Sequence, residues 1–390
     1  MRKQNGCLSV FIKLLSYVLV ALIASAITAG IFAKDYTKVD ELQALIQECF
    51  IGEVTDKELQ DGAAAGMVAA TGDKWSFYLT AEEYVDYQDQ MHNAYVGIGV
   101  TVTVREDGLG FDILSVEAGG GAKEAGILPG DIIVAVDGQV LAEIDANTAK
   151  AMIKGEENTS VAITVLRGEE ELTMDVVRKT IQVVVAQGQM LEDEIGLITI
   201  TNFDDRCSQE TIAAIEALIE QGAKGLIFDV RFNPGGYKHE LVQLLDYLLP
   251  EGVLFRSQYY TGEEDQDTSD ADCLDMPMAV LFNGSSYSAA EFFAAALEEY
   301  DWAVTVGEAT VGKSYFQSTV ELSDGSAVAL SMGRYCTPNG VSLQDEGGLV
   351  PSIPVELTDE EYLQLQMEEL TPDQDPQVQA AVEAVKKQMP

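Results

Sequence analysis

The stretch from residue 224 to residue 236 reads KGLIFDVRFNPGG, an apolar run that ends in a turn with two adjacent glycines. The apolar run predicts a buried strand, and the periodic segment HELVQLLDYLL at 239–249 predicts the helix that follows it. The same alternation extends outward, with strands expected at 194–203, 278–284 and 302–308 and helices at 208–222 and 288–300. Alternating strands and helices indicate an α/β domain with ligand groups at the strand ends. We place this domain at residues 183–370.

The composition limits the class of protein. A chain of 390 residues suggests two or three domains, and 47% apolar residues exclude wholesale disorder. The 23 basic and 65 acidic residues leave a net charge of −42, which argues against a nucleic-acid partner. The five cysteines form no CxxC pair and no other spacing typical of metal ligands, so we expect no zinc site. No metal or organic cofactor is expected for the chemistry predicted below.

The amino terminus contains one uncharged apolar run. Residues 14–33 form 20 residues without a charge, enough to span the hydrocarbon core as a transmembrane helix. Arg2, Lys3 and Lys13 precede the run, so the positive-inside rule places residues 1–34 as a cytoplasmic stub and signal anchor. A cleaved signal peptide, ending near Ala24-Ser25-Ala26, is the alternative. In either case the rest of the chain is expected outside the cytoplasm, membrane-anchored in one case and secreted in the other.

A helical segment is expected at 35–92, and a β-rich module at 93–182. Within the module, Gly97-Ile98-Gly99-Val100 opens a strand predicted over 95–104, and EAGILPGDIIVAVDGQ follows at 124–139. This combination resembles a PDZ domain. The resemblance implies that main-chain N–H groups of Gly97, Ile98, Gly99 and Val100 bind the terminal carboxylate of a peptide that adds a strand to the sheet edge. On its own, the glycine pair would favour a simple turn before a strand, and the later segment at 124–139 is what favours the PDZ domain.

Two segments outside these elements have a weaker pattern. The acidic run GEEDQDTSDAD at 262–272 is expected to be a solvated loop. The tail at 371–390 shows a short amphipathic pattern to which the sequence alone assigns no role.

Polar groups gather at two of the predicted strand ends. The Gly235–Gly236 turn presents main-chain N–H groups that would suit an anion or an oxyanion, although an ordinary tight turn has the same sequence. The segment NGSSYS at 283–288 ends a strand and places Ser288 at the start of a helix. Ser288 is therefore a candidate nucleophile, or an N-cap that forms a capping box with Glu291.

A serine nucleophile requires a base. His92 and His239 are the only histidines, and Lys313 is the other candidate. The pKa of a lysine, ordinarily about 10.4, must fall towards neutrality for this role, and burial among Val311, Tyr315 and Phe316 would lower it. GEATVGKS at 307–314 also satisfies the phosphate-loop pattern, but the residues after it predict a strand hairpin instead of the required helix, so nucleotide binding is not expected.

Five segments together resemble the carboxyl-terminal processing peptidases, which are serine proteases with an inserted PDZ domain. They are WSFYLTAEEY (75–84), FDVRFNPGG (228–236), NGSSYSAAE (283–291), VGKSYFQ (311–317) and RYCTPNG (334–340). The resemblance implies that Ser288 is the nucleophile, Lys313 its base and Gln317 the residue that orients the lysine. It further implies an oxyanion hole formed by Gly235, Gly236 and Ala289.

The chain departs from the family pattern at Tyr287, where a small residue is common, and at Gly72-Asp73-Lys74, where an Asp-Pro signature is usual. On a straight strand, residues four positions apart in the sequence lie some 13 Å from each other. Contact between Lys313 and Gln317 therefore requires a turn or a bulge.

The sequence thus predicts an anchored, extracytoplasmic serine endopeptidase of α/β plus PDZ architecture that acts by a Ser-Lys dyad. Its expected partners are protein or peptide substrates with accessible carboxyl termini, and a homo-oligomer is left open. A catalytically inactive PDZ-bearing scaffold is the alternative from another functional class. A serine hydrolase that uses His239 as its base is a third possibility.

Overall fold

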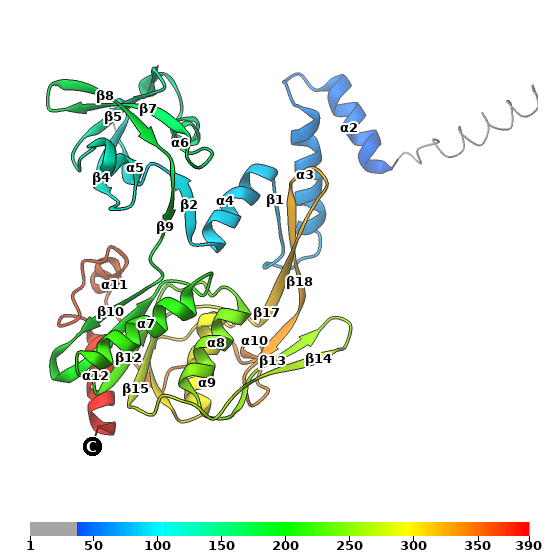
Figure 1. Ribbon diagram of the computed structural model, residues 1–390. Helices are drawn as coiled ribbons and strands as arrows, with labels where there is room; N and C mark the ends of the chain where they lie inside the picture. The colour runs from blue at the N-terminus through cyan, green and yellow to red at the C-terminus, as the bar shows by residue number, and fades with distance from the viewer. Residues whose placement is uncertain (1–36, 106, 390) are drawn as a thin grey trace, which may run out of the picture. The chain divides into compact units, whose positions relative to one another are not determined.

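The computed structural model describes residues 37–105 and 107–389, which belong to two compact units, Met1–Gly72 and Asp73–Pro390. In the first unit it describes α2 (Lys38–Cys49) and α3 (Asp56–Ala69) (Figure 1). Each of these helices is capped by a threonine and an acidic residue three positions later. The transmembrane helix predicted over 14–33 lies outside the described residues. Within 37–105 and 107–389, no helix has both the length and the apolar character that a membrane crossing requires.

The second unit begins with β1 (Phe77–Leu79) and α4 (Ala81–Met91) and continues into a β-rich module between residues 94 and 182. Its main sheet has the order β3-β4-β5-β7-β8, so β3 lies at an edge. The strands of this sheet are β3 (Val100–Val104), β4 (Phe111–Val116), β5 (Ile132–Val136), β7 (Ser160–Arg167) and β8 (Glu170–Val177), and β6 (Gln139–Val140) pairs with β5. Two helices complete the module, α5 (Gly121–Ala125) and α6 (Ala146–Ile153).

The strand predicted over 95–104 is in fact two strands. β2 (Ala94–Gly97) pairs with β9 (Lys179–Gln182), whereas β3 joins the main sheet. The chain turns at Gly99, which has φ +77° and lies so close to the next loop that a Cβ would approach Gly120 Cα to 2.7 Å. Only glycine fits this conformation and this contact, so the strand ends there.

The α/β domain is built on a six-stranded sheet of order β10-β11-β12-β15-β16-β19, parallel except for β10 (Figure 1). Its strands are β10 (Ala186–Met190), β11 (Ile195–Ile200), β12 (Gly225–Asp229), β15 (Met278–Phe282), β16 (Ala303–Gly307) and β19 (Ile353–Pro354). The predicted helices are confirmed as α7 (Cys207–Glu220), α8 (Lys238–Leu248) and α9 (Ala289–Glu299). Their apolar side chains share one buried cluster with alternate residues of β11, β12 and β15.

The opposite face of this sheet is covered by α12 (Pro376–Gln388), the segment to which the sequence assigned no role. Val378, Ala381, Val382 and Val385 form the amphipathic pattern, and all four lie in a second buried cluster with the remaining sheet residues. A buried ion pair of 2.7 Å joins Asp375, the N-cap of α12, to Arg231, two residues after the end of β12. The domain is therefore a three-layer α/β/α structure to which the carboxyl-terminal segment contributes.

A second sheet has the order β1-β18-β13-β14, with β17 paired to β18. β17 (Tyr315–Glu321) and β18 (Ala327–Cys336) form the predicted hairpin. The prediction of a loop at 262–272 is wrong, because Glu264–Ser269 forms β14 and pairs with β13 (Gly252–Tyr259). β14 is an edge strand, so its acidic side chains can remain in solvent while its main chain is paired. Two short helices, α10 (Leu343–Glu346) and α11 (Asp359–Gln366), complete the unit.

Candidate active site

Ser288 lies between the end of β15 and the first residue of α9. Its backbone has φ 57° and ψ −125°, a conformation sparsely populated by residues other than glycine. Holding such a residue costs on the order of 1–3 kcal/mol, and the surrounding contacts must maintain it. A strained turn between a strand and a helix is the position that exposes a nucleophilic serine in other hydrolases.

The Gly235–Gly236 turn packs directly against Ser288. Gly235 has φ +90°, and a Cβ at this residue would lie 2.7 Å from Ser288 Cβ and 2.8 Å from the Ala289 nitrogen. The Tyr287 N–H also donates to the Asn233 carbonyl at 3.1 Å. The structure therefore brings together the two segments that the sequence singled out, and glycine is required for that approach.

The N–H groups predicted to form the oxyanion hole are not equivalent. The Gly235 N–H donates to Asn233 Oδ1 at 2.8 Å, so this group already has an acceptor. Within residues 37–105 and 107–389, the Gly236 and Ala289 N–H groups have no hydrogen-bond acceptor. Ala289 is also the first residue of α9, where the helix dipole favours negative charge. These two N–H groups are the ones available to an oxyanion.

Lys313 extends beneath two aromatic rings. Its Nζ lies 4.8 Å from the centroid of the Trp75 ring and 5.7 Å from that of Tyr287, the residue before Ser288. Burial lowers the pKa of Lys313, although the charges of Glu291 and Asp73 act in the opposite direction. The residues that were predicted from the sequence to bury Lys313 do not do so, because Val311 and Tyr315 are themselves 37% and 38% exposed. Phe316 stacks instead on Tyr335.

Glu291 connects the serine to the lysine. Its side chain is fully buried, and one carboxylate oxygen accepts from the N–H groups of Ser288 and Lys313, both at 2.8 Å. The other oxygen accepts from the Gly312 N–H at 2.6 Å and from the Thr310 hydroxyl. The predicted capping box at the start of α9 is thus present, but the same carboxylate also holds the segment that carries Lys313.

The structure places Gln317 beyond a bulge between Phe316 and Gln317, in the region where the spacing required one. Its Nε2 donates to Ser331 Oγ at 3.0 Å and to the Tyr315 carbonyl at 3.1 Å. Among the described residues no hydrogen bond joins Gln317 to Lys313. Ser331 in turn hydrogen bonds with Asp73, and the negative charge of Asp73 acts on Lys313. Gln317 is therefore connected to the lysine through Ser331 and Asp73.

The two histidines lie together elsewhere. His92 Nδ1 is 2.7 Å from Asp205 Oδ2, and His239 Nε2 is 3.6 Å from Glu240 Oε1. In the described part of the chain, neither makes a hydrogen bond with Ser288.

Sequence reasoning missed Trp75 and Asp73 as neighbours of Lys313, although Trp75 begins one of the segments on which the family resemblance rests.

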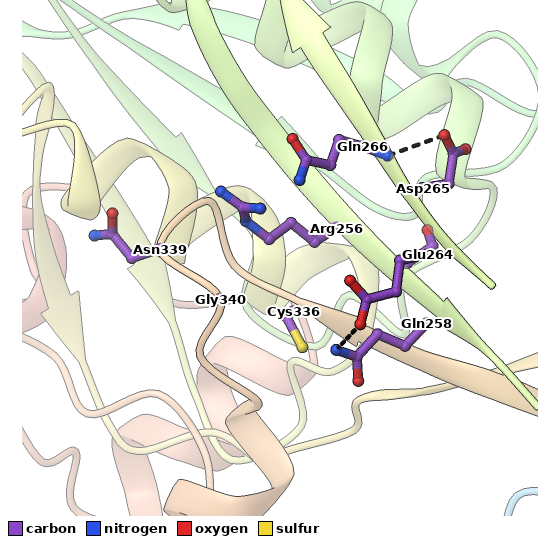
Figure 2. Close-up of a pocket in the computed structure, with 9 residues that line it drawn as sticks. Arg256, Gln258, Glu264, Asp265, Gln266, Cys336, Asn339 and Gly340 are labelled. Atoms are coloured by element: carbon purple, nitrogen blue, oxygen red, sulfur yellow. Dashed lines mark hydrogen bonds between the residues drawn. The ribbon is translucent and has the colours of Figure 1, made fainter. Parts of the chain in front are cut away.

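A polar cavity of 380 Å³ lies apart from these residues, between β13, β14 and β18. Its lining includes Arg256, Gln258, Glu264, Gln266, Cys336 and Asn339. Figure 2 shows the hydrogen bond of 3.1 Å between the Gln258 amide and the Glu264 carboxylate across this region. None of the residues around Ser288 or Lys313 lines the cavity, so it is no part of the candidate active site.

A serine on a strained turn beside N–H groups that have no acceptor is an arrangement typical of serine-type hydrolases. Residues 194–355 match the model of Peptidase family S41, residues 113–167 that of the PDZ domain, and residues 23–83 that of the activating protease CtpB N-terminal domain. The chain is 30% identical to the carboxy-terminal processing protease CtpA of Bacillus subtilis (strain 168) over 83% of its own length and 70% of that protein. It belongs to this family of carboxy-terminal processing serine proteases.

Other relatives and solved structures are similar over shorter shares or at lower identity. The "Probable CtpA-like serine protease" of Staphylococcus aureus (strain MRSA252) is 29% identical, over 82% of this chain and 64% of that one. The photosystem II D1 C-terminal processing protease is 25% identical with a TM-score of 0.47, over 80% of this chain and 86% of that one. Mature CPAF is 13% identical with a TM-score of 0.44, over 93% of this chain and 94% of that one.

Proposed function

We propose that the chain is an endopeptidase in which Ser288 attacks the scissile carbonyl and Lys313 is the general base. The observation that carries this proposal is the shared carboxylate of Glu291, which holds the main chain of both residues. Burial under Trp75 and Tyr287 lowers the pKa of Lys313 and so favours the neutral amine that can accept a proton.

In the proposed reaction, Lys313 Nζ takes the proton of the Ser288 hydroxyl as Oγ forms a bond to the carbonyl carbon. The N–H groups of Gly236 and Ala289 stabilise the negative charge that develops on the carbonyl oxygen. The lysine then returns the proton to the leaving amine, and water hydrolyses the acyl-enzyme by the reverse steps. Gln317 would act on the lysine through Ser331 and Asp73, as a positioning residue.

Covalent labelling tests the nucleophile. A fluorophosphonate probe is expected to modify the full-length chain at Ser288, because an activated serine attacks the phosphorus atom with loss of fluoride. Peptide mapping by mass spectrometry identifies the modified residue, and Ser288→Ala should remove the label. Ser285 and Ser286 lie in the same turn and are the internal controls. A label on either of them, or no label on a chain that cleaves an unfolded protein, would contradict the assignment.

We propose that the PDZ module captures substrate carboxyl termini. β3 lies at the edge of its sheet, where a peptide could add a strand. In the described residues, the N–H groups of Ile98 and Gly99, which precede β3, have no acceptor, and they would bind the terminal carboxylate with Gly97 and Val100 completing the loop. The apolar run at 14–33 would span the membrane and so keep the PDZ module on its extracytoplasmic side.

The role of the terminal carboxylate can be measured directly. For the Ser288→Ala chain, a peptide with a free, apolar carboxyl terminus is expected to bind roughly 10- to 100-fold more tightly than its carboxyl-terminal amide. A hydrogen bond to a charged group contributes about 1.5–3 kcal/mol, which corresponds to this ratio. Fluorescence anisotropy with a labelled peptide gives both affinities. Equal affinities for the acid and the amide would show that the loop does not recognise the carboxylate.

A further inference from the structure

Asp205, His239 and Glu240 form a cluster outside the catalytic residues. One ligand atom from each lies within 4.8 Å of the other two. Asp205 precedes α7, whereas His239 and Glu240 belong to the first turn of α8. His92 adds a contact of 2.7 Å from Nδ1 to the Asp205 carboxylate. Both histidines of the 390-residue chain, His92 and His239, therefore contact this cluster, although they lie far apart in the sequence.

The cluster has an excess of negative charge. The neighbouring Asp204 is only 8% exposed, and its Oδ1 has no hydrogen-bond partner among the described residues. The charges that act on Asp204 are those of Asp205 and Glu240. An unsatisfied buried carboxylate beside two others is costly unless a cation or a proton compensates it. The buried, unsatisfied oxygen of Asp204 is therefore a second observation, independent of the cluster itself, that indicates a site for a cation.

The basic residues nearest in sequence do not supply that cation. The guanidinium of Arg206 is directed to Glu210 and to the main-chain carbonyls of His92, Asn93 and Val183. Lys238 Nζ is 2.9 Å from Asp267, on β14. Each of these positive charges is therefore paired away from the cluster.

We propose that Asp205, His239 and Glu240 bind a divalent transition-metal ion such as Zn²⁺. An imidazole nitrogen and two carboxylate oxygens are suitable ligands, and water would take the remaining position. Zn²⁺ requires ligand atoms about 2.0–2.2 Å from the metal, so the three atoms must approach one another to roughly 3.3–3.6 Å. His239 Nε2 and Glu240 Oε1 already lie at 3.6 Å, and the exposed His239 ring packs against the ring of Tyr237 with the centroids 5.2 Å apart.

The surroundings hold two of the ligands in place. The Glu240 carboxylate accepts from the Arg206 N–H at 3.1 Å and from the Ser208 N–H at 2.7 Å, which fixes its orientation. His92 would orient the Asp205 carboxylate from outside the metal's coordination shell. The bound metal would join the segments 203–205 and 237–240. The Tyr237 N–H donates to Phe203 O at 2.8 Å and so pairs the two segments, and the Phe203 N–H donates to Gly235 O, in the Gly235–Gly236 turn, at 2.7 Å.

Calorimetric titration with ZnCl₂ tests this proposal on the full-length chain, purified in mild detergent without a histidine tag and stripped with a chelator. The exposed Cys49 and Cys273, together with Cys7, which lies outside the described residues, are first replaced by serine so that their thiols do not bind the metal. We expect one equivalent of Zn²⁺ to bind and to raise the melting temperature. Co²⁺ should give visible d–d absorption without a thiolate charge-transfer band.

Matched variants locate the site. His239→Ala is expected to weaken Zn²⁺ binding at least 100-fold, because a direct ligand is lost. His92→Ala should weaken it less, about tenfold, as removal of an outer partner does. Glu216→Gln, an exposed acidic residue on α7, should change nothing. Absence of Zn²⁺ binding by the parent chain, or undiminished binding by a folded His239→Ala chain, would overturn the proposal.

Discussion

Lys313→Ala is expected to lower kcat/KM for an unfolded protein substrate roughly 10²- to 10⁴-fold, the range that a positioned general base contributes. Alanine removes the amine that lies 4.8 Å from the Trp75 ring centroid and 5.7 Å from that of Tyr287, which is the group proposed to take the proton of Ser288. Steady-state hydrolysis of a fluorogenic unfolded protein gives the ratio. Lys313→Arg should be equally inactive, because a guanidinium stays charged at any working pH.

The direction of the pH dependence follows from the lowered pKa of Lys313. Activity requires the neutral amine, so the rate should rise with pH through a midpoint below the ordinary lysine value of about 10.4. Stability changes in the same direction. Below the unfolded-state pKa, the unfolded chain binds the proton more tightly than the folded chain does, so folding is disfavoured as the pH falls. Lys313→Met should therefore stabilise the fold at neutral pH, with a difference that narrows towards pH 10.

Lys74 is the matched control for Lys313. Its Nζ lies 4.5 Å from the centroid of the same Trp75 ring, but the residue is exposed. Lys74→Ala should leave kcat/KM within about twofold of the parent, as expected for a surface position. If Lys313→Ala retained activity and His239→Ala lost it, the histidine-dependent mechanism would replace the one proposed.

Local sequence patterns were enough to predict much of the fold. The helices α7, α8 and α9 and the hairpin of β17 and β18 are found where periodicity and turn residues predicted them. The acidic strand β14 was missed because its charges hide the usual strand pattern, and only pairing with β13 makes it a strand. The role of α12 could not be seen either, since its apolar face matters only against the far side of the sheet.

The sequence likewise predicted some residues of the candidate site and not others. Ser288, Lys313 and the glycine turn lie in recognisable segments, so sequence reasoning found them. Asp73 and Trp75 were missed because more than 200 residues separate them from Lys313, and no periodicity reports such a contact. The cluster of Asp205, His239 and Glu240 was missed for the same reason, since the spacing of its members along the chain is unlike that of any metal motif.

Glu291→Gln is expected to reduce both stability and activity, because four hydrogen-bond donors meet this fully buried carboxylate. The glutamine amide group must face some of these donors, and each buried N–H left without an acceptor costs about 1–3 kcal/mol. We therefore expect the free energy of unfolding, from urea denaturation, to fall by about 2–4 kcal/mol. The activity of the folded fraction should fall about 100-fold, because the main chains of Ser288 and Lys313 are no longer held together.

A shift in the pH–rate midpoint separates this positioning role from a loss of stability. The Glu291 charge raises the pKa of Lys313, so its removal should lower that pKa further and move the midpoint to lower pH. Glu299→Gln, on the same helix, is the control, because Glu299 accepts hydrogen bonds from Thr337 and Asn339 and lies outside the Lys313 environment. It should lose stability without moving the midpoint. An unchanged midpoint in Glu291→Gln would mean that Glu291 supports the fold but does not tune the base.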